Sequence, residues 1–379
     1  MRVTQISFYV DPERRYPEEL LDDWPTLSTI AYAIKTAGVA VSVIQANKIA
    51  GRVERSGIVY EFLSPGRVRR TLTKTEKFRE LITELHPDVF HVHGLGFARE
   101  VIELHALFPT VPILLQDHAD PVPRLWRRGK WRRAIRAATG VSFCARDQAE
   151  PLIRAGVLDP DKAVFELPES TSSFEPGKRS AARAQTGVYG EPAILWVGRL
   201  NANKDPLTVL EGMAAAIPDL PDLQLWCCFG SSPLLSKVKR RVDTDPALRG
   251  RVHLLGAVPH REVEVLMRAA DLFVLGSHSE GGSFALIEAL ATGLTPVATD
   301  IPSTSALTGY GEVGALWKKG DARDLGRAII RACADLDDSA RIRVRRYFNE
   351  HLSEEALGRR FSDVYRCLAG STQSALAQE

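Results

Sequence analysis

Short hydrophobic runs alternate along the chain with longer segments in which apolar residues recur at helical spacing. The short runs are typical of buried strands, and the longer segments are typical of amphipathic helices. Regular alternation of the two predicts parallel sheets covered by helices on both faces, an α/β arrangement of Rossmann type. In the first half, strands are predicted at residues 3–10, 39–44, 88–92, 113–116, 141–144 and 163–167, and helices at 26–37 and 74–85.

A polar segment, residues 169–178 with the sequence ESTSSFEPGK, interrupts this alternation and is predicted to be a linker. The alternation then restarts, so a second Rossmann-like domain is predicted after it. A chain of 379 residues is long enough for two domains with separate cores. Strands are predicted at 193–197, 223–229, 251–255, 271–276 and 295–298, helices at 206–216, 234–242, 261–269 and 283–292, and one or two more helices within 340–368.

Composition changes this picture little. The chain is 45% hydrophobic and 25% charged, as is ordinary for a globular protein, and its net charge of +2 gives no support for nucleic-acid binding. The five cysteines are sparse and odd in number, and they show neither metal-ligand spacing nor a disulfide framework. No run is long enough to span a membrane, and the N-terminus resembles a strand rather than a signal peptide. A cytoplasmic location is therefore expected.

The strongest candidate site lies between the predicted strand 271–276 and the helix 283–292. Glycines in the loop allow close approach of a ligand, and the first amides of a helix attract anions. Two carboxylates flank the site, and Glu288 could accept hydrogen bonds from ligand hydroxyls. A simpler interpretation makes Glu280 a helix cap and Glu288 a solvated position. The loop and helix start contain Glu280, Gly281, Gly282, Ser283 and Phe284.

Two cations occupy another predicted strand-to-helix loop. Arg199 and Lys204 follow the strand 193–197 and precede the helix that starts at Pro206. In parallel sheets such loops lie at one edge, so these cations are expected on the same edge as Glu280, where they could grip a diphosphate. Loop cations are also often simply solvated.

Together these motifs resemble a known family. VGRLNANKDP (residues 197–206), the pair Glu280 and Glu288, and EALATGLTPVATD (288–300) are similar to the retaining nucleotide-sugar glycosyltransferases of family four. The resemblance continues through residues 254–277 and is thinner in the first half, where DVFHVHG (88–94) and QDHAD (116–120) carry it. It implies the GT-B architecture, two Rossmann-like domains facing across a cleft. The expected parts are an acceptor domain at 1–170, a donor domain at 179–345 and a helix at 346–370 that returns to the first domain.

The resemblance also implies roles for single residues. The donor would be a nucleoside-diphosphate sugar, used as co-substrate without metal or other cofactor. The acceptor would be a sugar, a lipid-linked molecule or a small molecule. The implied catalytic residues are Glu280, at the donor sugar, and His118, over that sugar; the implied donor-binding residues are Arg199 and Lys204 for the diphosphate, Gly281, Gly282, Ser283 and Phe284 through their amides, Glu288 for the ribose, and Leu255 and Gly256 for the base.

Breaking a sugar–phosphate bond leaves negative charge on the diphosphate, which preorganised cations and amides would stabilise. Two other functions stay open on the same architecture. One is a nucleotide-sugar-binding protein without catalysis, and the other is a nucleotide-sugar epimerase or hydrolase. His118 alone is a weak signal, since a histidine after a strand is more often structural. The same structural interpretation is open for His91 and His93, as residues that cap the strand. GLGFAR (94–99) lacks the third glycine of a dinucleotide loop, so NAD binding is not predicted.

One segment lacks a feature of the family pattern, and a second is a basic cluster outside the family motifs. The family's paired glycines after the first strand are absent from residues 11–26, where Asp22 and Asp23 would repel a phosphate if they turned inward. The second segment, RLWRRGKWRRAIR between Arg124 and Arg136, mixes cations with Trp126 and Trp131. A solvated helix face with both tryptophans packed inward is favoured. Peripheral contact with the inner face of a membrane, or with an anionic acceptor, is the alternative.

Overall fold

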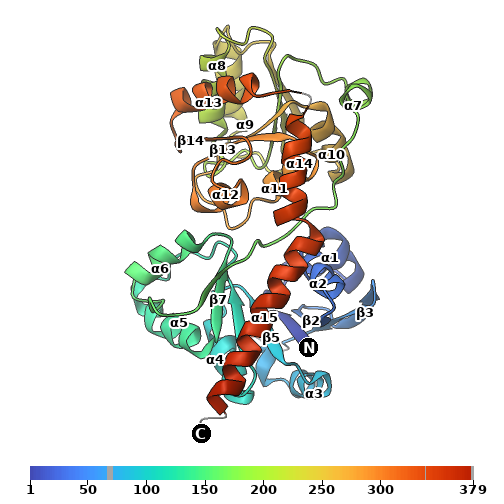
Figure 1. Cartoon of the computed structure of the whole chain (residues 1–379), viewed down its shortest axis with the longest axis vertical. Coiled ribbons are helices and arrows are strands. Elements are labelled where there is room, and N and C mark those ends of the chain that lie inside the picture. Colours follow the sequence, from blue (N-terminus) through green and yellow to red (C-terminus); the bar gives the residue numbers. More distant parts are fainter. Residues whose placement is uncertain (66–70, 338, 377–379) are drawn as a thin grey trace. The chain divides into compact units, whose positions relative to one another are not determined.

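The computed structural model describes residues 1–65, 71–337 and 339–376 (Figure 1). Contacts divide the chain into two compact units. Unit 1 comprises Met1–Ser170 together with Glu354–Glu379, and unit 2 comprises Thr171–Ser353. Each unit is a sheet with helices on its faces, which confirms the α/β prediction.

Unit 1 contains a sheet with the strand order β3-β4-β2-β1-β5-β6-β7-β8. Every pair is parallel except β3 and β4, which were not predicted. The order reverses at β1, which pairs with β2 on one side and with β5 on the other. The strands are β1 (Arg2–Ser7), β2 (Ala40–Ala46), β3 (Gly51–Arg55), β4 (Ile58–Leu63), β5 (Val89–His93), β6 (Ile113–Gln116), β7 (Gly140–Phe143) and β8 (Val164–Glu166).

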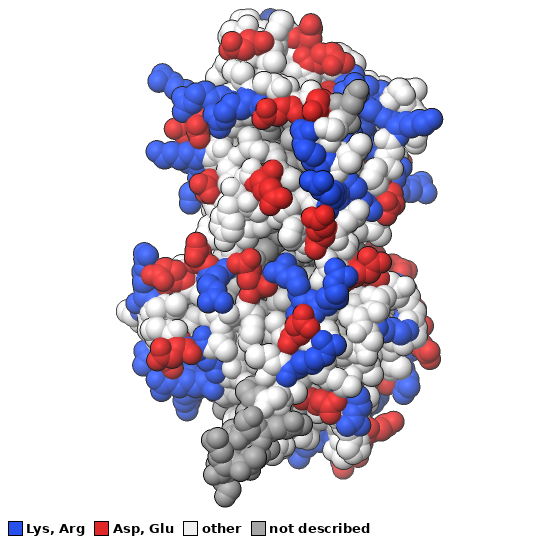
Figure 2. All heavy atoms as spheres, viewed as in Figure 1, with Lys and Arg blue, Asp and Glu red and all other residues white. Residues whose placement is uncertain are grey.

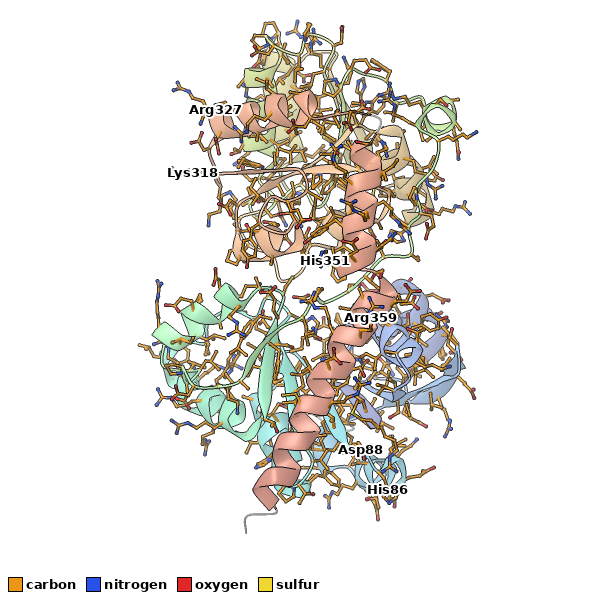
Figure 3. All side chains as sticks on the ribbon, in the orientation of Figure 1. His86, Asp88, Lys318, Arg327, His351 and Arg359 are labelled. Carbon is orange, nitrogen blue, oxygen red and sulfur yellow. The ribbon has the colours of Figure 1, made fainter. Side chains whose placement is uncertain are left out.

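The helices of unit 1 are amphipathic and begin and end at identifiable residues. In α3 the Thr75 side chain accepts a hydrogen bond from the Phe78 amide, and the helix ends at His86 in the left-handed conformation. Figure 3 labels His86. The helices are α1 (Pro17–Asp23), α2 (Pro25–Thr36), α3 (Glu76–Leu85), α4 (Ala98–Leu107), α5 (Leu125–Ala137), α6 (Glu150–Arg154) and α15 (Glu354–Leu376), with short 3₁₀ turns at Leu72–Lys74 and Arg146–Ala149.

The last helix completes the core of unit 1. Leu357, Phe361 and Tyr365 of α15 are buried against apolar residues of β1, α2 and β6. A side chain at Gly358 would meet the backbone of Ala33 in α2, so the two helices pack closely. The single helix expected from residue 346 to 370 is interrupted: α14 (Ala340–His351) belongs to unit 2, and α15 starts at Glu354. The amides of Leu352 and Ser353 both bond to the Phe348 carbonyl, which ends α14.

The expected packing of α5 is wrong in one respect. Trp131 is buried, but the side chain of Trp126 is 74% exposed. Trp131 follows Trp126 by five positions, so their side chains point about 140° apart around the helix and cannot share one face.

Unit 2 contains a fully parallel sheet with the order β11-β10-β9-β12-β13-β14. Its direction of growth reverses between β9 and β12, and Trp196 and Trp317 are fully buried in its core. Its strands are β9 (Ala193–Val197), β10 (Gln224–Cys228), β11 (Val252–Gly256), β12 (Leu272–Leu275), β13 (Thr295–Thr299) and β14 (Ala315–Trp317), and its helices are α7 (Arg179–Thr186), α8 (Pro206–Ala216), α9 (Leu235–Thr244), α10 (His260–Ala269), α11 (Phe284–Ala291), α12 (Pro302–Leu307), α13 (Ala322–Ala334) and α14.

Candidate active site

The point where the sheet of unit 2 reverses is the natural place for a ligand. In open parallel sheets, ligands bind beyond the carboxyl ends of the strands at such a switch point. Here β9 and β12 are neighbours, and each leads through a loop into a helix. The loop from β9 to α8 (residues 198–205) and the loop from β12 to α11 (residues 276–283) therefore meet at this edge.

Backbone and side-chain bonds join these two loops. The His278 amide donates to the Asn203 carbonyl at 2.8 Å, and the Asn203 side chain donates to the Ser279 carbonyl at 2.9 Å. His278 Nε2 lies 2.8 Å from a carboxylate oxygen of Asp205, which also caps α8. A Cβ at Gly276 would lie 3.0 Å from the Lys204 carbonyl oxygen, so the close approach requires glycine. The loops thus form one rigid edge.

Lys204 and Glu280 lie together on this edge. Lys204 Nζ is 2.5 Å from Glu280 Oε1, and the two side chains are only 14% and 12% exposed. Glu280 is further fixed by a bond from the Ser303 hydroxyl to its carbonyl at 3.0 Å. Arg199 belongs to the same loop as Lys204, and its side chain is exposed. A cation and a carboxylate are therefore held at the switch point.

The start of α11 offers polar groups next to Glu280. Gly281, Gly282 and Ser283 are buried, and Ser283 precedes the first turn without capping it through its side chain. Among the described residues, no partner accepts or donates a hydrogen bond to its buried hydroxyl. Phe284 begins the helix and is 41% exposed. Because first-turn amides have no intrahelical acceptor, this helix start suits an anion.

A second carboxylate lies further along α11. Glu288 Oε1 is 2.6 Å from Nε2 of His260 in α10. The hydrogen bond that the His260 ring donates to the Glu288 carboxylate raises the pKa of His260 above its ordinary value. Glu288 itself is 16% exposed, whereas the His260 side chain is 64% exposed. The carboxylate is thus oriented but still reachable.

Leu255 and Gly256 end β11, at the far side of the same edge. Gly256 has a φ of +74°, and its carbonyl accepts a bond from the Phe229 amide at 2.8 Å. Leu255 is 38% exposed. Three strand spacings separate β11 from β12, or about 14 Å. An elongated ligand could therefore span the edge from Leu255 to the start of α11.

Unit 1 contains a histidine–carboxylate cluster at the ends of β5 and β6. His118 Nε2 lies 3.0 Å from Nδ1 of His93, and His118 Nδ1 lies 3.2 Å from Oε2 of Glu169. Burial lowers the pKa of His118, but the hydrogen bond and charge of Glu169, with the charges of Asp117 and Asp120, outweigh it and raise that pKa. His118 is therefore the member of this cluster that most readily carries a proton.

The other histidines are held neutral. His91 is fully buried, with Nε2 3.0 Å from Gln116 Oε1 and Nδ1 2.8 Å from the Tyr365 hydroxyl. Burial and the charge of His118 lower the pKa of His91 to about 3. Burial likewise lowers the pKa of His93 well below its ordinary value. His91 is thus a structural residue that ties α15 to β5.

Three aspartates of the segment 11–26, which lacks the family's paired glycines, pair with arginines. Arg15 bonds to Asp11 at 2.9 Å and to Asp23 at 2.9 Å, and Asp22 pairs with Arg55 at 2.8 Å. Part of the segment forms α1. The aspartates that were expected to repel a phosphate therefore have positive partners.

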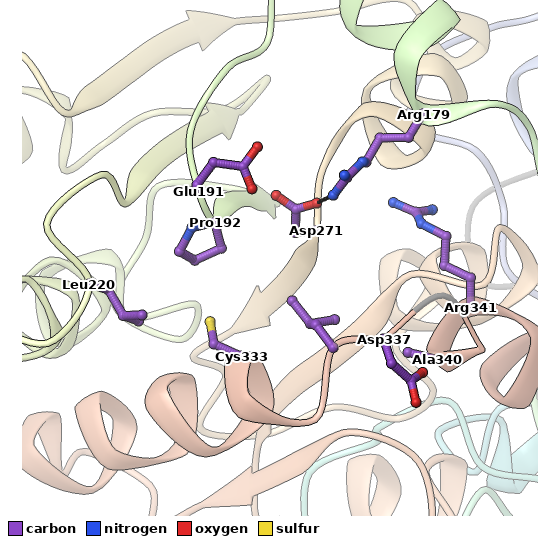
Figure 4. A pocket seen from close by; sticks show the side chains of 10 residues that line it. Arg179, Glu191, Pro192, Leu220, Asp271, Cys333, Asp337, Ala340 and Arg341 are labelled. Atoms are coloured by element: carbon purple, nitrogen blue, oxygen red, sulfur yellow. Dashed lines mark hydrogen bonds and ion pairs between the residues drawn. The ribbon is translucent and has the colours of Figure 1, made fainter.

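A cavity of about 590 Å³ lies at the opposite, amino-terminal edge of the sheet in unit 2 (Figure 4). Asp271, just before β12, points toward Arg179 across it and also pairs with Arg183 at 2.7 Å. Pro192, just before β9, also lines it. This cavity is separate from the switch-point edge. Asp271 is paired with both Arg179 and Arg183.

Within residues 1–65, 71–337 and 339–376, no three His, Cys, Asp or Glu side chains come together as a group that could hold a metal ion. Within the same ranges, no helix is both long and apolar enough to cross a membrane.

The structure brings some of the predicted residues together and adds new ones. Lys204 and Glu280 touch, and the predicted loop 280–283 leads into α11 as expected. His118 lies in unit 1 and the other predicted residues lie in unit 2. Sequence reasoning missed three partners that only the fold reveals, namely Glu169 beside His118, His260 beside Glu288, and His278 beside Asp205.

Comparison with known families gives matches in both units. The family described as Glycosyltransferase Family 4 matches residues 26–164, and the family described as Glycosyl transferases group 1 matches residues 191–335. The two matches cover nearly all the strands of both sheets.

Curated relatives share about a quarter of their residues with this chain over the matched regions. A D-inositol 3-phosphate glycosyltransferase of Nocardia farcinica is 27% identical over 206 residues, which is 52% of this chain and 46% of the relative. The GDP-mannose:cellobiosyl-diphosphopolyprenol alpha-mannosyltransferase of Xanthomonas campestris is 25% identical over 303 residues, 76% of this chain and 77% of the relative. The chain thus spans about half the length of the first of these relatives and about three quarters of the second.

Solved structures match the whole chain. Sucrose-phosphate synthase from Thermosynechococcus elongatus superposes with a TM-score of 0.72 at 21% identity, covering 98% of this chain and 99% of that one. Anabaena HepE in complex with UDP superposes with a TM-score of 0.69 at 16% identity, covering 97% and 100%. At these identities the likeness establishes the fold.

Proposed function

Since the chain belongs to the family-four glycosyltransferases and has the GT-B fold, we propose that it transfers a hexosyl group from a nucleoside-diphosphate sugar to an acceptor. We propose further that transfer retains the anomeric configuration and needs no metal. The observation that carries the proposal is the Lys204–Glu280 pair at the switch point, beside the start of α11. A sugar diphosphate presents both an anion for the lysine and amides, and hydroxyls for the carboxylate.

In this proposal the donor lies along the carboxyl edge of unit 2. Its diphosphate takes Lys204 as a cation, with Arg199 as a second, and accepts from amides at Gly282 and Ser283. Lys204 then exchanges Glu280 for phosphate, which frees the Glu280 carboxylate for sugar hydroxyls. The side chain is mobile enough for this exchange because a lysine ammonium rotates about a flexible stem.

The nucleoside occupies the remainder of the edge. Glu288 accepts from the ribose hydroxyls, and His260 holds the carboxylate in orientation. The base lies against Leu255 and Gly256. The span of about 14 Å across three strands matches a nucleoside diphosphate in length. HepE, a structural neighbour, was solved with UDP, which supports a nucleotide in this class of fold.

The proposed reaction depends on stabilising the negative charge of the leaving diphosphate. As the sugar–phosphate bond breaks, negative charge grows on the diphosphate, and the cations with the helix start stabilise it more in the transition state than in the bound donor. His118 is assigned to the transferred sugar. Its Nδ1 is tied to Glu169, so the proton on that atom is fixed. Its Nε2 lies 3.0 Å from His93, and in this proposal the imidazolium turns its Nε2–H from His93 to the negative charge of the reacting donor.

Three chemical classes of acceptor fit the proposal, namely a sugar, a lipid-linked molecule and a small molecule. The named relatives act on an inositol phosphate and on a diphosphopolyprenol-linked sugar. A binding protein without catalysis, or an epimerase or hydrolase, would use the same donor residues.

The test is donor binding and turnover with matched variants. Lys204→Ala is expected to weaken binding of UDP, GDP or ADP about 10- to 100-fold, the loss of one charged phosphate contact. Glu280→Gln is expected to bind nucleotide normally but to lose transfer at least 100-fold. Arg241→Ala, which breaks an ion pair on α9 of the same unit, is the control. EDTA should leave transfer unchanged.

Each rival function has its own result. Donor consumption without any acceptor indicates a hydrolase or an epimerase, and nucleotide binding without turnover across the three acceptor classes indicates a binding protein. Equal nucleotide affinity in the parent protein and Lys204→Ala would refute the assigned site.

A further inference from the structure

The first turns of α5 expose large apolar side chains. Leu125 and Trp126 are each 74% exposed, and Val122, just before the helix, is 38% exposed. The Arg124 guanidinium lies 5.3 Å from the centre of the Trp126 ring. Exposed aliphatic and indole groups that adjoin in sequence are costly in water, so their position calls for a partner.

The same helix is strongly basic. From Pro121 to Arg146 the sequence contains no aspartate or glutamate. Cations occur at Arg124, Arg127, Arg128, Lys130, Arg132, Arg133 and Arg136. In Figure 2 basic side chains gather over the part of unit 1 that α5 occupies in Figure 1.

Three of the arginines of α5 form bonds within unit 1. Arg128 and Arg132 donate to backbone carbonyls at Pro123 and Gly156, and Arg136 pairs with Asp159 at 2.8 Å. The Arg128 bond lies at the start of α5, and the other two bonds hold α5 against the loop that follows α6.

Helical geometry places the exposed groups on one face. Trp131, Ala134 and Ile135 are buried and mark the inner side of α5. Lys130 and Arg133 follow Trp126 by four and seven residues, so all three point outward together. Both cations are exposed. The outer side thus combines an apolar tip at the helix start with cations behind it.

We propose that this surface, formed by Leu125, Trp126, Lys130 and Arg133, docks the chain on an anionic lipid bilayer. Leu125 and Trp126 enter the headgroup boundary, where an indole is most favourable, while Lys130 and Arg133 lie over anionic headgroups. Long basic side chains can keep their charge at the phosphate level while their stems cover apolar surface. The combination of apolar insertion and charge provides the two signals that stable peripheral binding needs.

Charge and exposure together favour a membrane over nucleic acid. A nucleic-acid surface would bind the cations but would leave the Leu125 side chain in water. An anionic bilayer binds the cations through its headgroups and also buries the apolar side chain. If the chain has the proposed transferase function, on which this step rests, docking on a bilayer implies an acceptor held in that bilayer, such as a lipid-linked sugar.

The experiment measures binding of the full chain to vesicles, without donor or acceptor. Vesicles of phosphatidylcholine with an equal part of phosphatidylglycerol are compared with pure phosphatidylcholine. The parent protein is expected to bind the anionic vesicles at least tenfold more tightly. Lys130→Glu with Arg133→Glu is expected to weaken this binding at least 25-fold, about fivefold for each cation removed. Leu125→Ser with Trp126→Ser is expected to weaken it about tenfold.

Two controls remove similar groups elsewhere. Lys77→Glu with Arg79→Glu reverses two exposed charges on α3, and Ile342→Ser removes an exposed apolar side chain on α14. Both should bind vesicles like the parent protein. Circular dichroism checks that every variant folds.

The proposal is overturned if the parent protein binds both vesicle types equally or neither, or if Leu125→Ser with Trp126→Ser binds like the parent. Binding to duplex DNA without binding to anionic vesicles would overturn it in favour of nucleic acid. Transfer to a soluble acceptor should be unchanged in all these variants. Failure of transfer with intact vesicle binding therefore counts against the proposed function alone.

Discussion

Asp117 offers a quantitative test of the cluster around His118. The carboxylate is buried, with 5% exposure, and it accepts bonds from the Ala119 and Asp120 amides at 3.1 Å. Burial, with the charges of Asp120 and Glu169, raises the pKa of Asp117 to about 7. We therefore predict that Asp117→Asn makes unit 1 progressively more stable than the parent as pH rises.

The size of the effect follows from linkage. A carboxyl whose pKa rises from 3.8 to about 7 on folding destabilises the folded state by about 4 kcal/mol once ionised. The stabilising contribution of the protonated form is complete below pH 3.8 and is lost as pH rises through 7. Between pH 5 and pH 8 the parent should lose about 3 kcal/mol from this group, whereas the neutral asparagine loses none. A constant offset of about 1 kcal/mol is expected for a weaker acceptor.

The assay is urea unfolding followed by circular dichroism at pH 5, 6, 7 and 8. The difference between the variant and the parent should grow by about 3 kcal/mol over this range. Asp159→Asn is the control, because Arg136 lowers the pKa of the exposed Asp159 and its effect should be flat above pH 5. A flat difference for Asp117→Asn would show that Asp117 is ionised normally and that the reasoning is wrong.

Three further substitutions probe other contacts. Gly276→Ala would put a Cβ 3.0 Å from the Lys204 carbonyl, so unit 2 should lose about 1–3 kcal/mol in urea unfolding and nucleotide binding should weaken in calorimetry; unchanged values would contradict the close loop contact. Gly358→Ala would put a Cβ 2.0 Å from the Ala33 carbonyl oxygen, so unit 1 should lose about 3 kcal/mol, and hydrogen exchange in α15 should rise. His260→Ala should destabilise unit 2 more at pH 6 than at pH 8, because the raised pKa of His260 makes its bond to Glu288 strongest when protonated; equal losses at both pH values would exclude that pairing.

The sequence predicted those elements whose hydrophobic pattern is local. The helix expected at 283–292 is α11 (Phe284–Ala291), and the strand expected at 193–197 is β9. β3 was missed because GRVER alternates charged residues with small or apolar ones on an exposed antiparallel edge, which gives no buried run. The short strand β14 (Ala315–Trp317) gave too little pattern to detect.

Only those parts of the candidate site that lie within a single loop could be predicted from the sequence. A glycine-rich loop before a helix marks an anion site in any sequence, so Glu280 to Ser283 could be identified. The partners of these residues could not, because 51 residues separate His118 from Glu169 and 73 separate Asp205 from His278. Which strand ends become neighbours depends on strand order, and strand order is a property of the whole sheet.

Unit 1 is assembled from both ends of the chain, and this has a consequence for biosynthesis. When a ribosome has produced residues up to Ser353, unit 2 is complete, but Val3, Ile30 and Leu114 still lack the apolar cover that α15 provides. His91 also lacks the hydroxyl of Tyr365. These residues are therefore synthesised well before the helix that covers them, and a nascent chain must keep them from aggregating until α15 emerges.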